Sequence, residues 1–134
     1  MQVTPPQPPS EVRAVCERLA ARLPDRIDSE RRRKVTPDDP LTASWGDPPM
    51  VLRCGVGAPA LESPPAPAPQ VEGVTWSARK LRDGYLFTTS GRTVFVEMLV
   101  PGTYAPEVNP LVDLAPAVRA TVPCAPDAPE DICA

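Results

Sequence analysis

Proline limits where regular structure can form in this chain. Twenty-one of the 134 residues are proline, about three times the usual frequency, and they gather in residues 5–9, 59–69 and 123–129. Because proline lacks a backbone N–H and fixes φ, helix and sheet interiors largely exclude it. We therefore expect a Pro-rich arm over residues 1–9, an inserted Pro/Ala-rich loop over 58–70 and a Pro-rich tail over 123–134. The length fits a single domain, expected over residues 10–122.

The four cysteines are Cys16, Cys54, Cys124 and Cys133. None is spaced C-x-x-C, so neither a zinc knuckle nor a thioredoxin-type redox pair is indicated. An even number in a short chain fits a disulfide framework. Of the three possible connectivities we favour Cys16 with Cys54, which lie on predicted core faces, and Cys124 with Cys133, which share the tail. The alternative is four reduced, buried cysteines in a cytosolic protein.

The stretch after the arm predicts one helix. Ser10 is a favourable N-cap, and apolar residues follow it at helical spacing, with Cys16 in the apolar stripe. Pro24 is expected to end this helix. Residues 25–40 are densely charged and are expected to be irregular.

A rigid turn and a strand come next. The run Gly46-Asp47-Pro48-Pro49 is typical of a turn. After it, Met50, Leu52 and Cys54 alternate onto one side of a strand that ends at Gly55.

The second half of the chain predicts an antiparallel meander. Residues 74–79, 85–89 and 93–100 alternate as three strands, and Asp83-Gly84 and Ser90-Gly91 are favourable hairpin turns between them. One face is apolar and can pack on helices. The residues expected to lean outward are Arg79, Thr88 and Glu97.

A short C-terminal helix is expected after the meander. Asn109 can cap it, Pro110 suits its first position, and Pro116 is expected to break or restart it. The fold class is therefore α+β. We expect a small antiparallel sheet, formed by the meander and one or two further strands, packed by an N-terminal and a short C-terminal helix and braced by disulfides.

Several function classes lack support in the composition. The formal charge of -3 and pI near 4.9 argue against a nucleic-acid partner. The chain contains no histidine, which removes Ser/His/Asp and Cys/His catalysis and imidazole metal sites. No phosphate-binding glycine motif occurs. We therefore predict no catalytic residues, no metal site and no cofactor.

The candidate binding residues are Trp45, Asp47, Arg53 and Trp76. Trp45 beside a rigid proline turn can present a flat face, and Arg53 can offer its guanidinium to a carboxylate or a main chain. The alternative is that Trp45 fills the core and Arg53 pairs with a neighbouring carboxylate. The run Arg31-Arg32-Arg33-Lys34 could contact an anionic surface, but its acidic surroundings favour a solvated loop.

Several short motifs occur in a characteristic order. They are the helix bearing Cys16, Ala43-Ser44-Trp45-Gly46-Asp47-Pro48, Val51-Leu52-Arg53-Cys54-Gly55, Gly73-Val74-Thr75-Trp76 and Phe87-Thr88-Thr89. In this order, over roughly residues 5–123, the chain resembles the actinobacterial domain-of-unknown-function family 3515. The resemblance implies an exported or membrane-anchored protein with no assigned activity.

The expected disulfides and the family resemblance favour an extracytoplasmic location. The N-terminus lacks the basic and apolar regions of a signal peptide, and no stretch is long enough for a membrane helix. We therefore expect attachment to the membrane, if any, through a segment absent from this chain.

We expect a non-catalytic module that binds an envelope protein or a cell-wall component. The alternatives are a small-ligand carrier, which needs a concave pocket, and an enzyme that acts on wall polymers through two facing carboxylates.

Overall fold

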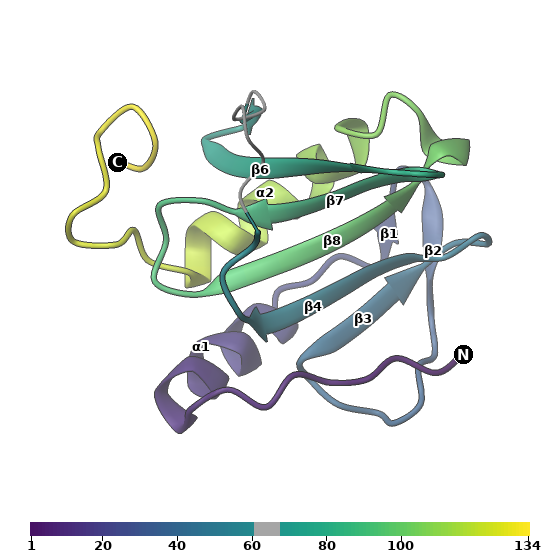
Figure 1. The fold of residues 1–134 in the computed structure, drawn as a ribbon. Helices are drawn as coiled ribbons and strands as arrows, with labels where there is room; N and C mark the ends of the chain where they lie inside the picture. The colour runs from purple at the N-terminus through teal and green to yellow at the C-terminus, as the bar shows by residue number, and fades with distance from the viewer. Residues whose placement is uncertain (61–67) are drawn as a thin grey trace.

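The fold is α+β, as expected, and consists of two helices against one antiparallel sheet (Figure 1). The computed structural model describes residues 1–60 and 68–134; residues 61–67, part of the expected Pro/Ala-rich loop, lie outside the described residues. The described strands are β1 (Arg26–Ile27), β2 (Glu30–Arg33), β3 (Thr42–Trp45), β4 (Met50–Val56), β5 (Gln70–Val71), β6 (Val74–Leu81), β7 (Gly84–Thr89) and β8 (Phe95–Pro101). The helices are α1 (Ser10–Ala20), the short 3-10 helix η1 (Gly102–Tyr104) and α2 (Asn109–Thr121).

The sheet has the strand order β1-β2-β3-β4-β8-β7-β6-β5. The predicted meander is confirmed as β6, β7 and β8, each antiparallel to the next. The hairpin of β3 and β4 joins it through the pairing of β4 with β8. The sheet is therefore two locally folded parts that meet along one seam.

The sheet is larger than the sequence indicated, because residues 25–40 are not wholly irregular. They contain β1 and β2, which form a tight hairpin with Ile27 opposite Glu30. The two turn residues, Asp28 and Ser29, both have positive φ, as a type I′ turn requires. The pair Asp-Ser is a weaker signal for this turn than Asn-Gly or Asp-Gly, so the sequence did not reveal it.

Both helices begin one residue away from the expected caps. Pro9 is the N-cap of α1, so Ser10 is its first helical residue, and its hydroxyl lies beside Glu11. In α2 the N-cap is Val108, and no side chain caps the helix. Packing, not capping, therefore fixes where these helices begin.

Pro116 does not break α2, contrary to expectation, and lies inside a continuous helix. The helix bond that Pro116 cannot donate would go to the carbonyl of Val112. Both residues are exposed, and Val112 is 44% exposed. Water can therefore satisfy that carbonyl, and the buried side of the helix is undisturbed.

The core lies between the helices and one face of the sheet, here called the inner face. Cys16 and Leu19 from α1 and Leu111 and Leu114 from α2 are at most 1% exposed. Helix α1 contacts β4, and α2 contacts β1, β5 and β6. The inner-face side chains of the long strands include Trp45, Met50, Leu52, Cys54, Trp76, Phe87, Val96, Met98 and Val100.

Two disulfides brace the fold with the favoured connectivity. Cys16 is bonded to Cys54 and so ties α1 to β4. Cys124 is bonded to Cys133 within the tail. The tail also lies against the sheet, since the Thr75 hydroxyl donates to the Ile132 carbonyl at 2.8 Å. Residues 123–134 are thus packed onto the domain.

Candidate functional site

The outer face of the sheet, opposite the helices, carries a row of polar side chains. Strand pairing places these residues side by side in the order Ser77, Thr88, Glu97, Arg53, Thr42, one from each of β6, β7, β8, β4 and β3. They share a face because side chains alternate along a strand. An adjacent row is aliphatic and contains Leu86, Leu99 and Val51. The outer face therefore offers hydrogen-bonding groups beside apolar surface.

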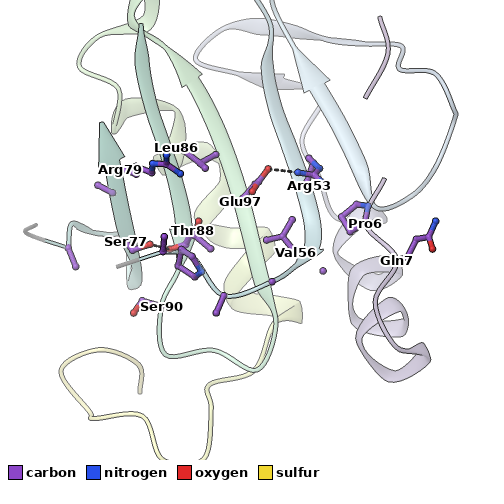
Figure 2. Close-up of a pocket in the computed structure, with 17 residues that line it drawn as sticks. Pro6, Gln7, Arg53, Val56, Ser77, Arg79, Leu86, Thr88, Ser90 and Glu97 are labelled. Carbon is purple, nitrogen blue, oxygen red and sulfur yellow. Dashed lines mark hydrogen bonds and ion pairs between the residues drawn. The ribbon is translucent and has the colours of Figure 1, made fainter. Parts of the chain in front are cut away.

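A cavity of about 780 Å³ lies over this face and is partly open to solvent; we call it the outer groove. Its floor comes from the central strands, and Figure 2 shows Ser77, Thr88 and Glu97 along it with Arg79 and Leu86 at one end. Its described walls come from Pro6 and Gln7 of the arm, residues 55–60 and Ala68. A concave site of this size with a few polar groups is typical of ligand and partner binding.

The N-terminal arm is held in place as one wall of the groove. Arg53 Nε donates to the Thr4 carbonyl at 3.1 Å, and the Val3 backbone N–H donates to the Thr36 carbonyl at 3.1 Å. Pro8 packs against Gly55, where a β-carbon would come within 2.7 Å of the proline ring. Gly55 has φ +93 and lies in a β-bulge of β4, so glycine here permits both the bulge and the close approach.

An ion pair crosses the groove floor between β4 and β8. Arg53 Nη1 lies 3.1 Å from Glu97 Oε2, and the two side chains are 34% and 17% exposed. Both charges are thus held in one geometry at the seam of the sheet, partly shielded from water. Glu97 is the single carboxylate among the described residues that line the groove.

The predicted binding patch is divided between the two faces of the sheet. Trp45 is fully buried on the inner face, where its indole N–H donates to the Pro24 carbonyl at 3.0 Å. Arg32 of the neighbouring strand β2 pairs with Trp45, and its guanidinium carbon lies over the indole ring, 5.2 Å from the ring centroid. The alternative interpretation, a core tryptophan, therefore describes Trp45. Since Trp45 pairs with Met50, strand alternation directs Arg53 to the other face.

The other two candidates also lie away from the groove. Trp76 is fully buried on the inner face, and its indole nitrogen has no hydrogen-bond partner among the described residues. The Asp47 side chain lies in the turn between β3 and β4 and is 88% exposed, with its Oδ1 3.8 Å from Arg33 Nη1. Of the four predicted residues, only Arg53 lines the groove.

Sequence reasoning placed Thr88 and Glu97 on the outward face but did not connect them to Arg53. The carboxylate beside Arg53 is 44 positions away in the chain, and nothing local in the sequence sets the pairing of β4 with β8. Thr88 is also only 3% exposed, because the groove walls cover this part of the face.

The basic run expected as a solvated loop is partly β2. Arg31, Arg32 and Arg33 belong to that strand and are exposed. Arg33 Nη1 donates to the Gly46 carbonyl at 3.1 Å. This segment therefore supports the β3–β4 turn.

Two ionisable groups away from the groove have shifted pKa values. Burial lowers the pKa of Arg92, and nearby Arg119 lowers it further; Arg92 donates to the carbonyls of Val122 and Gly73. Through these two hydrogen bonds Arg92 connects the end of α2 to the residue before β6. Burial also raises the pKa of Tyr104, and Glu30 adds to that effect.

The described residues contain no cluster of three or more side chains suited to a metal ion. None of the described helices is long and apolar enough to cross a membrane.

Comparison with known protein families gives a match over most of the chain. Residues 1–126 match the family model described as "Protein of unknown function (DUF3515)". The chain belongs to this family. No curated protein and no solved structure matches this DUF3515 chain. The match covers the arm, both helices and all the described strands, so the outer groove lies entirely within the DUF3515 domain.

Proposed function

We propose that this DUF3515 domain is a non-catalytic binding module of the extracytoplasmic envelope, and that it holds part of a partner in the outer groove. The observation that carries the proposal is the groove itself. It combines a cavity of about 780 Å³ with the polar row and an ion pair in its floor. The two disulfides support a place outside the cytoplasm. Export from an actinobacterial cell is the setting that the family resemblance implies.

The groove suits a partner better than a reaction. Its charged floor is occupied by the Arg53–Glu97 pair, and no second carboxylate lines it among the described residues. The two facing acids that wall-polymer hydrolysis requires are therefore not offered by these residues. Thr88 and Ser90 contribute hydroxyl groups to the lining, and the Ser77 hydroxyl, which donates to the Thr88 carbonyl, can still accept a hydrogen bond.

A site-specific cross-link tests the proposal. In one variant a photoreactive amino acid replaces Gln7 at the groove wall. In a second variant of the same protein it replaces Val112, an exposed residue of α2. Each is activated in the native envelope fraction. We expect the variant with the photoreactive residue at position 7 to give a defined cross-linked product. Adding Leu86→Glu in the groove floor to this variant should abolish the product, and adding the matched control Val112→Glu should leave it intact. Circular dichroism confirms that both doubly substituted proteins fold.

The same product from position 112 would contradict the proposal, as would a position 7 product that survives Leu86→Glu. Absence of any product from position 7 would also count against it.

A small-ligand carrier is the second candidate, favoured by the cavity volume, which lies within the usual range for ligand pockets. Native mass spectrometry of protein taken from its own envelope separates the two. A bound mass below about 1 kDa, lost in Leu86→Glu, would favour the carrier.

A further inference from the structure

We propose that the edge of β6 from Ala78 to Leu81, with which no described strand pairs, binds an extended acidic peptide segment of a partner as an additional strand. This inference rests on the proposed binding function and names the class of partner. Figure 1 shows β6 bordering the long strands on the side away from β3 and β4. Its outer neighbour, β5, pairs with Val74 and Thr75, and in the described part of the chain no strand pairs with the residues of β6 from Ala78 onward on that side.

Backbone geometry shows which groups the edge offers. The Ser90 N–H donates to the Thr75 carbonyl on the β7 side, and the Trp76 N–H donates to the Pro69 carbonyl on the opposite side. Successive residues of an antiparallel strand direct their backbone groups to alternate sides. The N–H and C=O groups of Ala78 and Lys80 therefore face the open edge, where no described strand pairs with them.

The charge along this edge selects an acidic partner. Arg79, Lys80 and Arg82 are all exposed, and none of them forms an ion pair within the described part of the chain. Residues 78–83 hold these three cations and one carboxylate, the exposed Asp83, so this edge has a net positive charge although the chain as a whole carries a formal charge of -3. Carboxylates on alternate residues of an added strand share one face of the sheet, so they would lie beside Arg79 on the outer face or beside Lys80 on the other.

The same charges disfavour a second copy of the chain. Two β6 edges paired antiparallel would bring Arg79, Lys80 and Arg82 of each copy together, and like charges facing each other across strands are destabilising. The edge therefore fits an acidic segment of another protein rather than its own counterpart.

The edge also connects to the outer groove. Ser77 and Arg79 belong to β6, and their side chains line the groove. A strand added at Ala78 would place alternate side chains next to Ser77 and Arg79 on the outer face. One extended segment could thus pair with the edge and reach the groove.

The test uses two fluorescent heptapeptides, one of alternating glutamate and valine and one with lysine in place of each glutamate. We expect the acidic peptide to bind about tenfold or more tightly than the basic one, and less tightly as salt is raised. Binding should also slow amide hydrogen exchange at Ala78 and Lys80 in the unsubstituted protein.

The matched variants are Ala78→Pro and Ala78→Ser. Proline removes the N–H that faces the edge and leaves the bonds to β7 in place, as edge strands allow. We expect Ala78→Pro to weaken peptide binding about tenfold and Ala78→Ser to leave it within about twofold.

Equal binding of the two peptides, or exchange at Ala78 and Lys80 that does not change, would overturn the inference even if Ala78→Pro does not fold. Self-association through this edge would overturn it as well. If the acidic peptide does not bind at β6 but the cross-link from position 7 still forms, the β6 edge is not the binding site and the proposed function stands. Peptide binding without that cross-link would reject the groove as the site of contact.

Discussion

The two faces of this sheet are built from alternate residues of the same strands, and they differ in what covers them. The inner face is sealed by α1, α2 and the Cys16–Cys54 bond, and its Trp76 and Met98 are fully buried. The outer face is covered in part by the arm, and its Glu97 and Leu86 keep some exposure. Stability is therefore concentrated on the inner face, which leaves the outer face free to vary with the binding function proposed for it.

The largest expected effect compares one large side chain from each face. Trp76→Ala should lower the free energy of unfolding by about 3–5 kcal/mol, because it leaves a cavity in a fully buried site. Leu86→Ala on the outer face should cost about 1–2 kcal/mol, since that side chain is only half-buried. Urea denaturation followed by circular dichroism measures both, and equal losses would contradict the division between the faces.

The disulfides sharpen the comparison, since one pins the inner face and the other closes the tail. The Cys16→Ala/Cys54→Ala variant should lose about 4 kcal/mol and the Cys124→Ala/Cys133→Ala variant about 2.7 kcal/mol, because the first bond closes the longer loop. The sequence separations are 38 and 9 residues. Calorimetric unfolding of each variant against the oxidised protein provides the measurement. A larger loss from the tail bond would show that the tail carries more of the fold than its loop length indicates.

The smallest expected effects lie at the starts of the helices that cover the inner face. Neither Ser10 nor Asn109 is a cap in the structure, so Ser10→Ala and Asn109→Ala should each change stability by less than about 0.5 kcal/mol. A true N-cap would cost about 1 kcal/mol. Thermal melts of the two variants distinguish these outcomes.

The sequence predicted those parts of the fold that depend on local pattern. Alternation and turn residues located the meander, and the placement of Cys16 and Cys54 on apolar faces indicated their bond. The β1–β2 hairpin was missed because its Asp28-Ser29 turn is an uncommon pair. Pro116 was expected to break α2, since nothing local shows that its helix bond falls on the solvent side.

The candidate site was harder to predict than the fold, because it depends on register between distant strands. Aromatic residues near a turn suggested a surface patch, yet Trp45 is one of few large side chains available and is used in the core. The partner of Arg53 is set by the pairing of β4 with β8, which brings together segments with no shared local signal.

That same pairing has a consequence for the order of folding. Hairpin β3–β4 and meander β6–β7–β8 can each form from neighbouring residues, whereas the contact of Arg53 with Glu97 spans 44 positions. Closing long loops is slow because chain entropy must be lost before the contacts form. A chain that emerges from its N-terminus would have Cys16 and Cys54 in reach of each other before β8 is available. The floor of the outer groove is therefore expected to be among the last parts of the molecule to assemble.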